Sequence, residues 1–179
     1  LLYVGTLQSR KNITTLVEAF DEIKEDYPDL KLVLAGKKGW LYKEIFDRVT
    51  QLKLGHRVVF TGYVNDMQLS SLYSHALCFV LPSLYEGFGV PILEAMHYKV
   101  PVICSNNSSL PEVGGAAALY FDPLKPDDLA EKLSRVLSDK PLQLDLIQKG
   151  LTQVRKFSWE KSAARTLEVL QSVAYETTR

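Results

Sequence analysis

The chain has 179 residues, which suits one domain with a buried core and is too short for two independent ones. Hydrophobic residues make up 46% and charged residues 23%, and no run reaches the roughly 18 apolar residues that a membrane span needs. Because 21 Lys and Arg balance 21 Asp and Glu, the overall charge gives no long-range attraction for nucleic acid or anionic lipid, so any anion site must be local.

Six short apolar runs predict six buried strands. They are rich in β-branched or aromatic residues and lie at 1–4, 30–35, 58–60, 77–81, 100–104 and 117–121. Segments of helical period separate them, the alternation of a parallel sheet with helices on both faces. The predicted fold is α/β, a doubly wound six-stranded parallel Rossmann-like sheet with strand order 3-2-1-4-5-6.

Helices are predicted between these strands and after the last one. The first spans 12–26, where apolar residues recur every three or four positions, and Pro28 ends it. The others are expected at 41–52, from Asp66 onward, and at 89–98, 126–138, 141–156 and 159–175.

The cysteines and the first residues bear on the setting of the protein. Cys78 and Cys104 lie in predicted buried strands, where a thiol acts as a small hydrophobe, so a reducing, cytoplasmic setting is favoured. The chain opens on an apolar run without an initiator Met or a signal-peptide layout, and we expect it to be part of a longer protein.

The most informative stretch is LPSLYEGFGVPILEAM at 81–96, a strand end followed by a glycine-bearing loop and a helix start. Ligands of open parallel sheets bind where strands end in this way. Gly87 and Gly89 let the backbone approach a ligand, and the free N–H groups of the helix favour an anion. The loop therefore suits a nucleoside diphosphate.

Two carboxylates in this stretch can face one cleft above the sheet. Glu86 lies in the loop and Glu94 about one and a half turns into the helix, and carboxylates accept hydrogen bonds from sugar and ribose hydroxyls. Taken alone, each carboxylate has a simpler explanation. A Glu in a loop is usually just solvated, and a Glu near a helix start interacts favourably with the helix dipole, which stabilises the helix by ~0.3–1 kcal/mol. Their joint pattern favours a site.

This stretch resembles the Glu-x₇-Glu motif of the glycosyl transferases group 1 family, which comprises retaining enzymes of the GT-B fold. The resemblance continues through YVGTL at 3–7, RKN at 10–12, VLAG at 33–36, VFTGYV at 59–64, PVI at 101–103 and LPEVG at 110–114. It implies that the chain is the C-terminal, sugar-donor-binding lobe of a mannosyltransferase-like enzyme whose N-terminal, acceptor-binding lobe is missing.

The resemblance also implies roles for individual residues. Glu86 would approach the donor sugar and Glu94 would bind the ribose of the nucleotide. The backbone N–H groups of Phe88, Gly89 and Val90 would hold sugar hydroxyls and the diphosphate at the helix start.

A second anion-binding element is the pair Arg10 and Lys11, where two cations can neutralise charge on a departing diphosphate. A basic pair before a helix can equally be solvated, but Lys11 falls at the position of the family's phosphate-binding Lys. The family often reads Gly-Arg-Leu where this chain has Gly5 and Thr6, so one expected cation is missing. Arg10 is the candidate replacement.

The nucleobase is expected near the ends of the second and third strands. Tyr63 and Val64 stand where family members hold the base through backbone groups, although a plain turn is an alternative. Gly36 ends the neighbouring strand and, like Gly5 and Thr6 after the first strand, is expected to contact the sugar donor. Trp40 follows it, and packing against the second helix is a more economical expectation for Trp40 than stacking on a base.

Neither a metal nor a cofactor is expected. His56, His75 and His97 have no ligand companions at a recognisable spacing, and the substrate implied by the resemblance is a nucleoside diphosphate sugar. Lys99 stands where the family has the Gly that caps the preceding helix. Either the cap differs here, or a non-Gly residue adopts φ > 0 at a cost of about 1–2 kcal/mol.

The expected reaction is transfer of a hexose, with GDP-mannose as the favoured sugar donor, to an acceptor hydroxyl with retention at the anomeric carbon. The expected partners are the nucleotide sugar and the missing lobe, with no nucleic acid. Residues 158–179 are expected to form a terminal helix that packs on that lobe, although it could instead cover this domain. Any attachment to the inner membrane would run through the missing lobe.

Other classes of protein fit less well. A dehydrogenase would need G-x-G-x-x-G after a strand, with an acidic residue beyond the next strand, and this chain lacks that pattern. A GT-B sugar-nucleotide epimerase and a non-catalytic nucleotide-binding module remain open. The isolated domain is expected to be inactive as a transferase.

Overall fold

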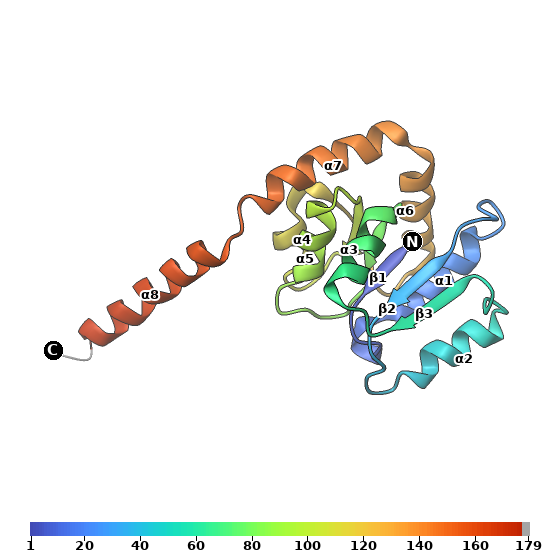
Figure 1. Cartoon of the computed structure of the whole chain (residues 1–179), viewed down its shortest axis with the longest axis horizontal. Helices are drawn as coiled ribbons and strands as arrows, with labels where there is room; N and C mark the ends of the chain where they lie inside the picture. The colour runs from blue at the N-terminus through green and yellow to red at the C-terminus, as the bar shows by residue number, and fades with distance from the viewer. Residues whose placement is uncertain (177–179) are drawn as a thin grey trace.

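The computed structural model describes residues 1–176 and contains one six-stranded parallel sheet (Figure 1). The strands are β1 (Leu2–Val4), β2 (Leu32–Ala35), β3 (Val58–Gly62), β4 (Phe79–Leu81), β5 (Val102–Ser105) and β6 (Ala118–Phe121). Their order is β3-β2-β1-β4-β5-β6, and every neighbouring pair is parallel. The predicted fold and strand order are confirmed.

Eight α-helices and two 3₁₀ turns accompany these strands in residues 1–176. The helices are α1 (Ile13–Ile23), α2 (Lys43–Gln51), α3 (Asp66–His75), α4 (Val90–His97), α5 (Leu110–Gly114), α6 (Pro126–Ser138), α7 (Lys140–Val154) and α8 (Trp159–Glu176). The 3₁₀ turns are η1 (Ser9–Lys11) and η2 (Gly115–Ala117). The sequence did not predict α5 or either 3₁₀ turn.

The helices cover the two faces of the sheet because the chain leaves its centre in both directions. From β1 it moves outward to β3, and from β4 it moves outward to β6, so right-handed crossovers place their helices on opposite faces. Helix α1 packs against both α2 and α6, whereas α4 packs with α7. β4 and β5 are buried along their whole length, which explains their continuous apolar sequence.

Both cysteines lie in this core. Cys78 and Cys104 are fully buried, as expected from their apolar surroundings. Burial raises the pKa of the Cys78 thiol to about 12, so the thiol stays neutral.

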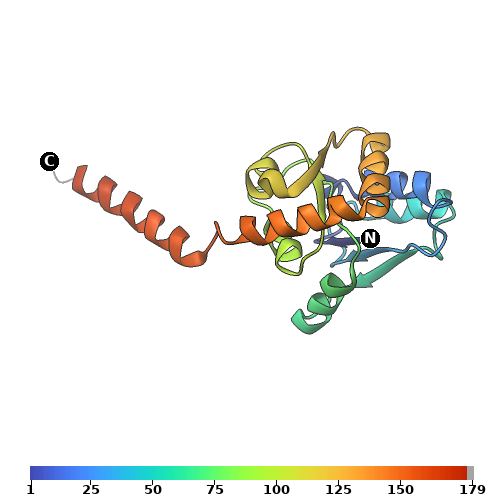
Figure 2. The same cartoon turned by 90° about the horizontal axis from the view of Figure 1, so that it is seen from above.

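Helix α8 stands clear of the rest of the molecule (Figures 1 and 2). Its side chains are exposed from Trp159 to Ala174, among them the large apolar residues Trp159, Leu167, Val169, Leu170 and Val173. The alternative that this helix covers the domain is therefore wrong for the described residues. The last three residues of the predicted terminal segment, 177–179, lie outside them. None of the described helices is long and apolar enough to cross a membrane.

Trp40 corrects one prediction. It is 79% exposed rather than packed against α2, because that helix begins only at Lys43 and Leu41 adopts a left-handed φ of 59°. The aromatic residue that packs here is Phe46, within α2. Its ring stacks on Phe60 of β3 with 4.0 Å between centroids.

Lys99 adopts a φ of 61°, so the left-handed helix cap is present without glycine. The Lys99 N–H donates to the Met96 carbonyl at 3.0 Å, and the Val100 N–H donates to the Ala95 carbonyl at 2.9 Å. These bonds satisfy the end of α4. The fold tolerates the cost of about 1–2 kcal/mol that a side chain incurs in this conformation.

Candidate functional site

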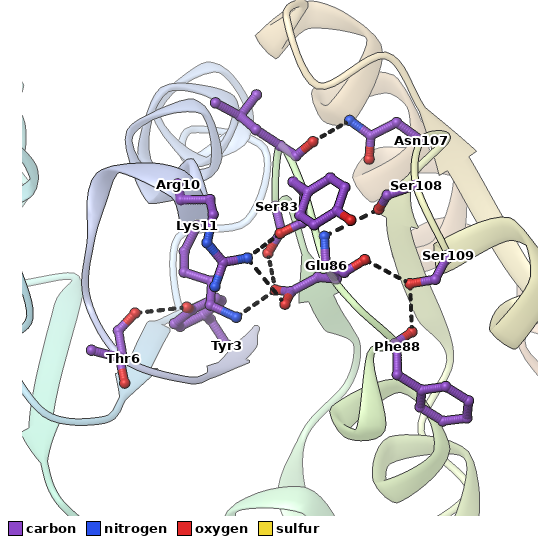
Figure 3. A network of polar contacts seen from close by, with 12 residues as sticks. Tyr3, Thr6, Arg10, Lys11, Ser83, Glu86, Phe88, Asn107, Ser108 and Ser109 are labelled. Atoms are coloured by element: carbon purple, nitrogen blue, oxygen red, sulfur yellow. Dashed lines mark hydrogen bonds and ion pairs between the residues drawn. The ribbon is translucent and has the colours of Figure 1, made fainter. Parts of the chain in front are cut away.

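The candidate site lies at the carboxyl ends of β1 and β4, the two central strands. They pair directly, with Leu2 opposite Phe79, and their helices leave towards opposite faces of the sheet. The loop after β1, which contains η1, and the loop after β4, residues 82–89, therefore flank one crevice. This arrangement brings Arg10 and Lys11 against Glu86, 75 residues further along the chain (Figure 3).

The Glu86 carboxylate is held by three side chains. Lys11 Nζ lies 2.5 Å from Oε1, the Ser83 hydroxyl donates to the same oxygen at 2.6 Å, and the Arg10 guanidinium lies 3.4 Å from Oε2. Only 11% of the Glu86 side chain is exposed. Burial acts to raise the pKa of Glu86, but the hydrogen bonds from Lys11 and Ser83, with the two positive charges, hold it below its usual value. Glu86 is therefore an anion at neutral pH.

A buried phenol lies beside this cluster. The Tyr3 hydroxyl donates to the Thr6 carbonyl at 3.2 Å, and burial together with the charge of Glu86 raises the pKa of Tyr3. Thr6 is exposed and brings no charge. The Arg10 guanidinium also donates to the Tyr85 carbonyl, so Arg10 supplies a second cation near Lys11.

Glu94 has a partner that the sequence did not indicate. The Tyr73 hydroxyl, from α3, donates to Glu94 Oε2 at 2.9 Å, and the Tyr73 ring stacks on Tyr98. Tyr73 is 1% exposed, and burial and the Glu94 charge raise its pKa. Within residues 1–176, Oε1 of Glu94 takes no hydrogen bond and can accept one from a ligand. The sequence identified Tyr73 only as part of an apolar helix face.

The start of α4 offers backbone hydrogen-bond donors. Gly89 precedes the helix with a φ of 102°, and a Cβ there would approach Leu110 to 2.8 Å, so this position requires glycine. In the described part of the chain, the N–H groups of Gly87, Phe88, Gly89 and Val90 make no hydrogen bond. The N–H groups of Phe88, Gly89 and Val90 are those that the family resemblance assigned to the sugar and the diphosphate, and Gly87 adds one more.

Gly5 and Gly36 differ from these loop residues, because their role is to let two strand ends approach and not to offer N–H groups. Their own N–H groups donate to the carbonyls of Ala35 and Gly62, at 2.9 Å each, and are already used. A Cβ on Gly36 would lie 1.9 Å from the Gly5 carbonyl oxygen. The two glycines therefore let the ends of β1 and β2 approach closely.

Tyr63 and Val64 lie at the end of β3, two strands away from β1 on the same edge of the sheet. Tyr63 is 69% exposed, and the Lys37 ammonium lies 4.7 Å from the centre of its ring. An exposed ring beside a cation can stack on a base, and the Lys37 ammonium is the charged group that lies beside it.

A hollow of about 680 Å³ lies at the opposite, amino-terminal ends of the strands, lined mainly by apolar residues that include Leu1, Leu30 and Leu77. It is remote from the charged cluster. Within residues 1–176, no three His, Cys, Asp or Glu side chains are placed to share a metal ion.

Comparison with known proteins identifies the family of this chain. The sequence pattern of the family described as "Glycosyl transferases group 1" matches residues 1–153. The chain is 41% identical over 170 residues to O-antigen chain mannosyltransferase B of Escherichia coli, and 34% identical over 177 residues to the serotype-specific mannosyltransferase WbdA of the same species. These alignments cover 93% and 94% of this chain but only 44% and 21% of the relatives. The chain thus spans less than half the length of either one.

Solved structures show the same fold. Sucrose-phosphate synthase from Thermosynechococcus elongatus aligns with a TM-score of 0.85 and 31% identity, over 98% of this chain and 45% of that one. The C-terminal domain of LpcC, a glycosyl transferase group 1 family protein from Francisella tularensis, aligns with a TM-score of 0.77 and 27% identity, over 87% of this chain and 83% of that domain. The chain belongs to the glycosyl transferases group 1 family and has the fold of the C-terminal lobe of a GT-B glycosyltransferase.

Proposed function

We propose that this chain is the sugar-donor-binding lobe of a retaining glycosyltransferase that moves a hexose from a nucleoside diphosphate sugar to an acceptor hydroxyl. One observation carries the proposal. Glu86 lies between Lys11 and Arg10 at the ends of the two central strands, beside unbonded N–H groups at the start of α4. These cations and N–H groups can stabilise the diphosphate as it leaves, without a metal.

The proposed roles follow from this geometry and from the family motif. Glu86 faces the donor sugar, Glu94 accepts hydrogen bonds from the ribose, and Lys11 and Arg10 neutralise the phosphates. The acceptor binds to the other lobe of the longer protein. The buried thiols agree with a reducing, cytoplasmic setting.

GDP-mannose is the proposed sugar donor, because the two E. coli relatives reported above are named mannosyltransferases. We expect GDP-mannose to raise the melting temperature of the chain more than UDP-, dTDP- or ADP-sugars in a thermal-shift panel. At a concentration of 100 Kd a ligand adds about 2.7 kcal/mol of stability, which such a panel resolves. A shift with NAD and none with any nucleotide sugar would indicate a dehydrogenase and contradict the proposal.

The second lobe is proposed to pack on the exposed apolar residues of α8. We therefore expect the isolated chain, mixed with GDP-mannose and acceptor oligosaccharides, to form no product, whereas the longer protein does. Product formation by the chain alone would refute the need for a second lobe. Acceptor-dependent release of nucleoside diphosphate by the longer protein would separate a transferase from an epimerase and from a silent binding module.

The double variant Leu167→Asp and Leu170→Asp tests the role of α8. Both side chains are exposed in this chain, so the change should leave its melting temperature nearly unchanged while lowering turnover by the longer protein. Glu168→Ala on the same helix is the matched control.

A further inference from the structure

Three consecutive residues of the loop after β5 reach across to the loop after β4 (Figure 3). The Asn107 side-chain amide donates to the Leu84 carbonyl at 2.9 Å, and the Ser108 hydroxyl accepts from the Glu86 N–H at 3.1 Å. The Ser109 hydroxyl lies 3.0 Å from the Glu86 carbonyl oxygen and 2.9 Å from that of Phe88.

Arg10 holds the same loop from its other side. Its backbone carbonyl accepts from the Leu84 N–H at 3.0 Å, and its guanidinium donates to the Tyr85 carbonyl. The peptide group that joins Tyr85 to Glu86 is thus bonded at both ends, to Arg10 through its carbonyl and to Ser108 through its N–H. The orientation of this peptide is fixed.

The Ser109 contacts determine where two further N–H groups point. In a planar trans peptide the carbonyl and the N–H point in opposite directions. Because the carbonyls of Glu86 and Phe88 face the Ser109 hydroxyl, the N–H groups of Gly87 and Gly89 face away from it. Neither N–H makes a hydrogen bond within residues 1–176, and a Cβ on Gly87 would meet nothing within 4 Å.

The loop that carries these serines is itself strained. Ser108 has a φ of 49°, a left-handed conformation that costs a non-Gly residue roughly 1–2 kcal/mol. The Asn107 side-chain oxygen and the neighbouring Ser105 hydroxyl are buried and have no hydrogen-bond partner within residues 1–176. Strain of this kind persists where the surrounding structure holds a functional conformation.

We propose that Ser109, supported by Asn107 and Ser108, is a positioning residue that aims the N–H groups of Gly87 and Gly89 at the nucleoside diphosphate sugar. This rests on the proposed function of the site. Ser109 contacts the backbone of the loop and acts on the ligand only through it. One hydroxyl proton serves two carbonyls, so its loss releases two peptide groups at once.

The test compares Ser109→Ala with Ser109→Thr, which keeps the hydroxyl, and with Ser138→Ala, a control in α6 whose hydroxyl donates to the Ser134 carbonyl. Backbone NMR order parameters of the ligand-free chain report on the loop. For Gly87 and Gly89 we expect them to fall from about 0.85 to below about 0.6 in Ser109→Ala alone. We also expect affinity for GDP and for GDP-mannose to drop about tenfold in that variant and to return in Ser109→Thr.

The two measurements separate this inference from the proposed function. If the wild type binds neither probe, the proposed function fails, and rigid glycines in Ser109→Ala would then overturn the positioning role as well. If the wild type binds both probes, unchanged order parameters or unchanged affinity in Ser109→Ala overturns the positioning role alone. If Ser109→Ala unfolds the chain, Ser109→Cys takes its place, because a thiol fills the space of the hydroxyl but is only a weak donor to the two carbonyls, and it must produce the same local loosening.

Discussion

Glu94→Ala is expected to weaken the binding of both GDP and GDP-mannose by about 10- to 100-fold. A hydrogen bond to a charged group contributes about 1.5–3 kcal/mol, and 1.4 kcal/mol is a factor of ten in Kd. The variant also leaves the buried Tyr73 hydroxyl without its acceptor, which costs roughly 1–3 kcal/mol, so its melting temperature should fall. Calorimetric titration and thermal unfolding measure the two effects.

Two further variants separate binding from stability. Glu94→Gln keeps an acceptor for Tyr73 and loses only the charge, so stability should be retained while affinity still falls. Tyr73→Phe removes the hydroxyl and leaves the carboxylate, so most of the affinity should remain. If Glu94→Ala is less stable but binds both probes as the wild type does, Glu94 has a structural role and the ribose assignment is wrong.

Glu86→Ala is expected to change selectivity rather than overall affinity. Removing the carboxylate frees Lys11 and Arg10 from their ion pairs, so GDP should bind as tightly as before or more tightly. The variant also loses the proposed contact between Glu86 and the sugar, so the preference for GDP-mannose over GDP should fall by about tenfold or more. The ratio of the two dissociation constants gives the result directly.

Lys11→Ala is the matched change on the other side of the ion pair. It removes a cation while Glu86 keeps its contacts with Arg10 and Ser83. The binding of GDP and of GDP-mannose should weaken to the same extent. If Glu86→Ala and Lys11→Ala shift both ligands equally and in the same direction, the division of roles between sugar and phosphate is contradicted.

The sheet could be predicted because its signal is local. Each strand is a short apolar run that must be buried on both faces, and right-handed crossovers leave few ways to order six of them. The ion pair between Lys11 and Glu86 was not predicted, although both residues follow strands that this order makes neighbours. The prediction of the site depended instead on the glycine-bearing loop after the fourth strand and on the resemblance of residues 81–96 to the family motif.

The features that were not predicted depend on contacts that leave no periodic pattern in the sequence. Tyr73 was indistinguishable from a core residue, because only the final placement of α3 against α4 brings its hydroxyl to Glu94. Ser109 meets Glu86 through backbone carbonyls, whose direction depends on peptide orientations that side-chain patterns do not encode. Trp40 was expected to pack, but the left-handed turn at Leu41 delays the start of α2 and leaves the indole in solvent.

The close approach of Gly36 to Gly5 limits how this protein can diverge. No side chain can be added at Gly36 without moving the end of β1, so the corner where β1 and β2 end is formed by backbone and depends on glycine at this position. A change of nucleotide preference in this framework must therefore come from nearby positions that tolerate substitution. Three such positions lie at or near the ends of β2 and β3. Trp40 and Tyr63 are largely exposed, and the Lys37 ammonium lies over the Tyr63 ring.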